Sequence, residues 1–99
     1  MDKNVQFHPL FAVDISDAGA WYESRSPGLG HHFCEAVRDS IAPVIADPQK
    51  HTFIDPHIRY REVKKFPYLV LFEVNDEQLC MYAVIHAARS PDLWRVRRP

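Results

Sequence analysis

The sequence predicts an α+β fold in which a helical hairpin packs on a β-sheet in two layers, and two observations support this. The hydrophobic pattern has a helical period in the first half of the chain, whereas it has a strand-like period from His51 onward. Two late segments, 68–74 and 79–86, are apolar at nearly every residue. Because strands of this kind are covered on both faces, we expect them at the centre of the sheet.

The first elements are a short strand at 5–7 and a helix over about 9–25, with Pro9 suited to the first helical turn. Apolar residues at helical spacing give this helix a buried face: Phe11, Ile15, Ala18 and Tyr22. Gly19 costs up to about 1 kcal/mol relative to alanine inside a helix. Its presence predicts the close approach of a second helix.

That second helix is expected to begin after Ser26, as the N-cap, with Pro27 in its first turn, and to run to about Ala46. Its apolar stripe consists of Phe33, Val37, Ile41 and Val44. Pro43 lies inside the stripe and removes a backbone donor, which predicts a kink or an early end. A phosphate-binding loop at Gly28-x-Gly30 is disfavoured, because this loop joins two helices instead of following a strand.

The second half of the chain is expected to form strands. Segments 52–54 and 58–65 read as strands separated by a proline, and Phe66-Pro67 predicts a bend or a strand edge. The two apolar segments at 68–74 and 79–86 are joined by a polar turn at 75–77, and therefore predict a β-hairpin.

The length of 99 residues predicts one domain over residues 1–99. Hydrophobic residues make up 46% and charged residues 25% of the chain, which is typical of a folded protein. No apolar run approaches the length of about 20 residues that a membrane span needs, and the first residues do not resemble a signal peptide. We therefore expect a cytoplasmic protein that does not bind a membrane.

Neither cofactor nor metal binding is predicted. The six histidines lack the i, i+4 spacing of a helical metal site, and no serine has the sequence context of an activated nucleophile. Cys34 and Cys80 lie far apart in no metal or redox motif, and are expected to be buried free thiols.

Charge is distributed unevenly. Residues 1–56 contain four Lys/Arg and eight Asp/Glu, whereas residues 57–99 contain eight Lys/Arg and five Asp/Glu. Such separation suits an anionic partner. The candidates for binding a target or a partner protein are Arg59, Arg61, Lys65, His86, Arg89, Trp94 and Arg95.

Three interpretations of these residues remain open. If their strands are near neighbours, Arg59, Arg61, His86 and Arg89 line one concave surface that binds phosphate. The same set could assist RNA cleavage, in which a base takes the 2′-hydroxyl proton and cations stabilise the transition state. It could also be a solvated edge that discourages aggregation. Trp94 either packs the C-terminal segment back onto the sheet or serves as an exposed anchor.

A series of motifs, in this order and spacing, resembles the RelE/ParE superfamily of bacterial toxins, which are often described as plasmid stabilisation proteins. The motifs are Trp21-Tyr22-Glu23, Pro27-Gly28-Leu29-Gly30, Phe33, Arg59, Phe66-Pro67-Tyr68 and Ala83-Val84-x-His86-x-x-Arg89-Ser90-Pro91-x-x-Trp94. The resemblance spans about Val5 to Arg95. It implies a strand, two helices and four further strands, with the first strand beside the last.

The resemblance also implies a cognate antitoxin that wraps the toxin in a hetero-oligomer. Two targets are known in the superfamily: one branch cuts mRNA on the ribosome and the other inhibits DNA gyrase. The nuclease branch has an arginine after the tyrosine that opens the central strand, where this chain has Leu69, and basic residues where it has Tyr60 and Glu62. Arg89 matches a nuclease arginine, whereas Trp94 stands where that branch often has a tyrosine.

A ParE-like toxin that binds gyrase without hydrolytic chemistry is therefore the leading expectation. An mRNA endoribonuclease and a degenerate, non-toxic family member are the alternatives.

Overall fold

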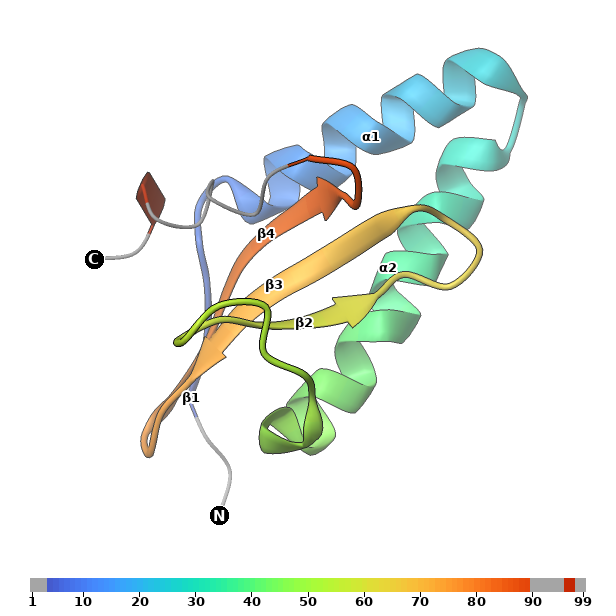
Figure 1. The fold of residues 1–99 in the computed structure, drawn as a ribbon. Helices are drawn as coiled ribbons and strands as arrows, with labels where there is room; N and C mark the ends of the chain where they lie inside the picture. Colours follow the sequence, from blue (N-terminus) through green and yellow to red (C-terminus); the bar gives the residue numbers. More distant parts are fainter. Residues whose placement is uncertain (1–3, 90–95, 98–99) are drawn as a thin grey trace.

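A computed structural model of the chain describes residues 4–89 and 96–97 (Figure 1). The elements in chain order are β1 (Asn4–Phe7), α1 (Phe11–Arg25), α2 (Leu29–Ala46), the 3₁₀ turn η1 (Pro48–Lys50), β2 (Arg59–Glu62), β3 (Tyr68–Val74) and β4 (Gln78–His86). The four strands form one sheet in the order β1-β4-β3-β2. β1 runs parallel to β4, and the other pairs are antiparallel.

The predicted α+β fold is confirmed, with the α1–α2 hairpin packed on one face of the sheet (Figure 1). The sheet differs from the expectation in two details. It is mixed rather than antiparallel, because β1 is parallel to β4. Three strands, not four, follow the helices in the described residues, because segment 52–54 contributes only an isolated bridge between Phe53 and Arg59.

The two apolar strands lie at the centre of the sheet, as predicted. The main core lies between the sheet and the helices, and includes the fully buried Phe33, Val37, Val44, Val70 and Phe72. A second cluster on the opposite face contains Ile58, Leu71, Tyr82, Ala83 and Ile85. Strands β3 and β4 therefore contribute side chains to both clusters, which explains why they are apolar at nearly every residue.

The prediction that a second helix approaches α1 closely at Gly19 is confirmed. A β-carbon added to Gly30 on α2 would lie 2.5 Å from the carbonyl oxygen of Gly19 on α1, so the two backbones touch at this point. A side chain on Gly30 would force them apart.

Two helix starts were predicted wrongly. α1 begins at Phe11, because the His8 ring accepts a hydrogen bond from Leu10 N–H and holds Pro9 in a turn before the helix. Ser26 does not cap α2, which begins at Leu29 after Gly28 in a left-handed conformation (φ 87°). The Glu23 carboxylate instead accepts hydrogen bonds from Gly28 N–H (2.9 Å) and Gly30 N–H (3.0 Å).

The remaining differences are local. α2 continues through Pro43 to Ala46, so the proline ends the helix only one turn later. Strand β2 is shorter than the predicted 58–65, because residues 63–67 form a turn with Lys65 at φ 72°. Both cysteines are free, as predicted, but Cys34 is exposed and Cys80 half-buried, so the prediction of buried thiols was wrong.

Candidate functional site

A groove of about 890 Å³ lies between α1 and the end of β4. We call it the α1–β4 groove. Helix α1 provides one wall, and the end of β4 with the following turn provides the other. The described residues that line it are Asp14, Asp17, Ala18, Trp21, Tyr22, Pro67, Tyr68, Val84, Ile85, His86, Ala88 and Arg89.

Trp21 is the most exposed aromatic side chain of the groove. It is 52% exposed, although its indole contacts the Tyr22 ring edge to face at 5.1 Å and the Arg25 guanidinium at 4.6 Å. It lies off the buried face of α1, as does the exposed Val13. A large aromatic ring held in place but left half in solvent is typical of a binding surface.

Tyr22 joins the groove to the core. Its ring stacks on Phe33 at 5.3 Å and meets Phe66 edge to face at 4.9 Å. Burial raises the pKa of the Tyr22 phenol, with a further contribution from Tyr68. The phenol therefore stays protonated at neutral pH and does not act as a general base there.

His86 and Arg89 form the rim at the end of β4. His86 Nδ1 accepts a hydrogen bond from Ala88 N–H at 3.0 Å, and Arg89 N–H donates to the His86 carbonyl at 2.9 Å. The His86 ring also contacts Tyr68 at 5.3 Å. Because Nδ1 is used as an acceptor, the neutral ring carries its proton on Nε2. The Arg89 side chain is exposed.

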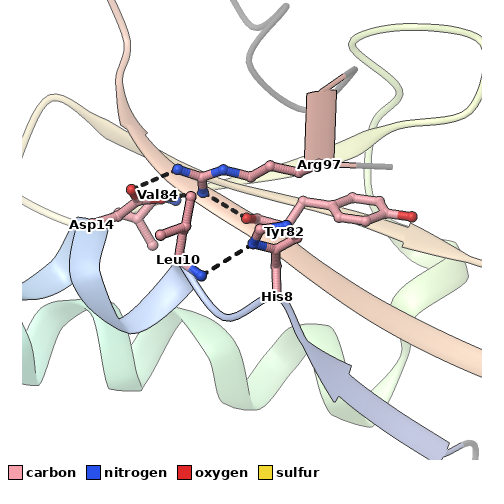
Figure 2. A network of polar contacts seen from close by, with 6 residues as sticks. All are labelled: His8, Leu10, Asp14, Tyr82, Val84 and Arg97. Carbon is pink, nitrogen blue, oxygen red and sulfur yellow. Dashed lines mark hydrogen bonds and ion pairs between the residues drawn. The ribbon is translucent and has the colours of Figure 1, made fainter. Parts of the chain in front are cut away.

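A polar network that includes Asp14 and Val84 of the groove connects α1 to β4 (Figure 2). β1 pairs with β4 only as far as Met81, so no strand of the described residues lies beside the edge of β4 beyond this point. The Asp14 carboxylate accepts from Val84 N–H at 2.9 Å and from both terminal nitrogens of Arg97, at 2.7 and 3.0 Å. Arg97 also donates to the Tyr82 carbonyl at 2.8 Å. Side chains thus satisfy backbone groups that a strand would otherwise bond.

The structure does not bring the predicted basic residues into one surface. Arg59 donates from Nη1 to the carbonyls of Gln49 (3.0 Å) and His51 (2.6 Å), and its guanidinium lies 3.9 Å from the Phe53 ring centroid. These contacts fix the segment after α2 to β2, which is a structural role.

Arg61 and Lys65 line other hollows, next to β2, whereas His86 and Arg89 lie on the α1–β4 groove. The expectation that Arg59, Arg61, His86 and Arg89 line one surface was therefore wrong, because β3 separates β2 from β4. Trp94 and Arg95 lie outside the described residues.

Sequence reasoning missed Asp14 and Trp21, which line the groove, and Arg97, which binds Asp14. A signal existed for Trp21, because it falls outside the predicted buried face of its helix. No local signal existed for Asp14 and Arg97, which are 83 positions apart in the sequence.

The chemistry of the groove favours binding. It combines aromatic surface, a half-buried imidazole and an exposed guanidinium, which suit contact with another macromolecule. Among the described residues, no three His, Cys, Asp or Glu side chains are placed to hold a metal ion. None of the described helices combines the length and the apolar character of a membrane span.

Comparisons with known proteins agree with this fold. No family model matches the sequence, and no curated protein matches it. One solved structure, described as the chromosomal ParDE TA system from P. aeruginosa, contains a chain that superposes with a TM-score of 0.75. The match covers 85% of this chain and 95% of that chain at 11% sequence identity. The chain therefore has a RelE/ParE-like fold, which confirms at the level of structure the resemblance indicated by its motifs.

Proposed function

We propose that this protein is the toxin of a type II toxin–antitoxin module, and that it acts by binding a macromolecular target through the α1–β4 groove. The observation that supports this proposal most strongly is the α1–β4 groove, with the exposed Trp21 on one wall and Arg89 on the rim. The fold of this chain also matches that of a chain from a ParDE TA system. A cognate antitoxin neutralises the toxin in a hetero-oligomer, and both act in the cytoplasm.

The proposed mode of action is ParE-like binding, with DNA gyrase as the target suggested by the family resemblance. Two observations support binding over RNA cleavage. Arg59 is held by two carbonyl groups, and Arg61 lies on a different surface from His86 and Arg89. Within the part of the chain that the structure describes, these arginines are thus not assembled around one point, as a dianionic transition state would need.

Expression of the protein without its neighbouring reading frame tests the proposal. Growth should stop, DNA supercoiling should be lost and messages should remain intact. Co-expression of the neighbouring protein should restore growth. A translation block with cleaved messages would identify an endoribonuclease and overturn the gyrase target, whereas unimpaired growth would identify a non-toxic family member.

The groove is tested by Arg89→Ala and Trp21→Ala, measured as toxicity alongside the circular dichroism of the purified variants. Both side chains are largely exposed, so the variants should fold and lose toxicity. Loss of one contact of this kind weakens binding by about 1–2 kcal/mol, which is about five- to thirtyfold. Arg38→Ala, an exposed arginine on α2, is the matched control and should remain toxic. Full toxicity of both groove variants would rule the groove out.

A further inference from the structure

A second surface, next to β2, carries exposed cations that the α1–β4 groove does not use. A hollow of about 980 Å³ lies there, and four cationic side chains line it: Lys50, Arg61, Lys64 and Lys65. We call them the β2 basic cluster. All four are exposed, and in the part of the chain that the structure describes none of them forms an ion pair. Glu62 is the one carboxylate among the described residues of this hollow, so four cations and one anion leave a local charge of +3.

The turn that carries two of these cations is anchored in the core. Lys64 and Lys65 lie between Val63, which is 3% exposed, and Phe66, whose ring contacts the core aromatic rings of the helices. Phe66 N–H donates to the Val63 carbonyl at 3.3 Å and closes the turn. The backbone under the cations is therefore fixed before any ligand binds, which lowers the entropic cost of binding.

Acidic side chains on α2 adjoin the cluster without neutralising it. Glu35 and Asp39 line the neighbouring hollow. The Glu35 carboxylate already contacts His31 at 3.1 Å and Arg38 at 3.6 Å. Asp39 is exposed and forms no ion pair with a described cation of the cluster. The four cations therefore remain available to an anionic ligand.

We infer that the β2 basic cluster binds the phosphate backbone of double-stranded DNA and does not read its sequence. Lysine and arginine side chains that neutralise phosphates release the counterions condensed on the duplex, and this release provides the affinity. The surface is separate from the α1–β4 groove, because β3 lies between β2 and β4. The groove thus stays open to a protein target while the cluster contacts DNA. The choice of DNA over an RNA duplex rests on the proposed function, in which the target is an enzyme that acts on DNA.

Two other anionic occupants fit the hollow less well. A single-stranded nucleic acid gains affinity by stacking its bases on aromatic rings. The aromatic rings of this hollow, Tyr60 and Phe66, are half-buried and packed against the apolar clusters of the sheet. An extended acidic peptide has at most one charge per residue, or per about 3.3 Å, whereas a DNA duplex has one per about 1.7 Å. The duplex therefore presents more charge to four neighbouring cations.

Fluorescence anisotropy with the purified full chain tests the inference. The probe is a labelled DNA duplex of about 12 base pairs, a little more than one helical turn. Because the net charge of the protein is −1, long-range attraction is small and the Kd should lie at about 1–100 µM at low salt. The logarithm of the affinity should fall with the logarithm of the salt concentration with a slope of about −3 to −4, since four phosphates are neutralised. Duplexes of different sequence should bind equally.

Variants that retain the circular dichroism of the wild type locate the site. Arg61→Ala and Lys64→Ala should each weaken binding about threefold and reduce the salt slope by about 1. Lys65→Gly removes a third cation and suits a residue at φ 72°. Glu62→Gln removes the carboxylate of the hollow and should strengthen binding about threefold. Arg89→Ala carries the same loss of charge beyond β3 and should bind like the wild type.

Four results would overturn the inference: no salt-dependent binding of the duplex, a clear preference between duplex sequences, cluster variants that bind like Arg89→Ala, or weaker binding by Glu62→Gln. Three competitors with the same number of charges identify the occupant. Tighter binding of a single-stranded RNA or of an oligoglutamate would show that the occupant is not a duplex. Tighter binding of an RNA duplex would overturn the choice of DNA.

These measurements separate the DNA contact from the proposed toxin activity, because they use purified components and need no toxicity. Absent DNA binding by a protein that still stops growth would overturn the DNA contact alone. Salt-dependent DNA binding by a protein that leaves growth unimpaired would support the contact and overturn the toxin activity.

Discussion

At the scale of single residues, Glu23 shows how one side chain replaces an expected cap. Its carboxylate accepts from the N–H groups of Gly28 and Gly30, which are the donors that a phosphate would use in a glycine-rich loop. The Glu23 carboxylate thus occupies the position that a phosphate group would take in such a loop. The hydrogen bonds from Gly28 and Gly30 are the main reason that the pKa of Glu23 is lowered. Desolvation opposes this shift, and the nearby His31 and His32 add smaller contributions in the lowering direction.

This lowered pKa makes stability depend on pH in a defined direction. The contribution of Glu23 is fully present above its unfolded value of about 4.5, and is lost as pH falls through the lower folded value. Thermal unfolding over a series of acidic pH values should show the wild type losing stability as pH decreases. Glu23→Gln should be less stable at neutral pH and should lose less on acidification.

The matched control for Glu23→Gln is Asp17→Asn, which removes an exposed carboxylate from the same helix. Its stability at neutral pH should equal that of the wild type. An unchanged neutral stability of Glu23→Gln would contradict a capping role for this carboxylate.

At the scale of elements, the α1–α2 hairpin depends on two glycines that are not equivalent. A β-carbon at Gly30 would lie 2.5 Å from the Gly19 carbonyl oxygen and 3.0 Å from Glu23. A β-carbon at Gly19 would meet Cys34 Sγ at 3.4 Å and Gly30 O at 3.8 Å, which are ordinary contacts. The steric constraint therefore belongs to Gly30, although Gly19 is the one that the helical pattern singles out.

Paired alanine substitutions distinguish the two positions in chemical denaturation. Gly30→Ala should reduce the free energy of unfolding by about 1–3 kcal/mol, because the two helices must separate. Gly19→Ala should raise it by up to about 1 kcal/mol, because alanine favours the helix and fits the available space. Equal effects would mean that the helices do not meet as closely as described here.

At the scale of the whole molecule, Asp14 and Arg97 tie α1, β4 and residues near the C-terminus together. Their side chains are 14% and 6% exposed, and two parallel hydrogen bonds join them (Figure 2). Such a pair is costly to break, because the remaining partner is left as a buried, uncompensated charge. Arg97 Nε is buried without a hydrogen bond in the described chain, so the guanidinium is not fully satisfied even when paired.

A double-mutant cycle measures this connection. Asp14→Ala and Arg97→Ala should each destabilise the protein by about 3 kcal/mol, and the double variant by clearly less than the sum. Arg38→Ala, which removes an exposed pair with Glu35, should cost less than about 1 kcal/mol. Additive losses from the first two substitutions would show that the side chains do not stabilise the fold as a pair.

Much of the fold was predictable because it depends on local patterns. The helices, the β3–β4 hairpin and the central place of these strands follow from hydrophobic periodicity and from turn residues. Cap and boundary residues were predicted less well, since Glu23 reaches α2 from another helix. The candidate site was predicted in part: His86 and Arg89 do share a surface, but Arg59 and Arg61 lie elsewhere.

The sequence by itself determined the α+β fold class, the apolar central strands and the excess of basic residues in the second half of the chain, because each depends on residue type and on spacing along the chain. Only the tertiary structure decided which charges meet. Strand order placed β3 between the arginines of β2 and the rim of β4, and folding brought Asp14 to Arg97 across most of the chain. Contacts of this kind depend on the packing of distant elements, and no local pattern in the sequence encodes them.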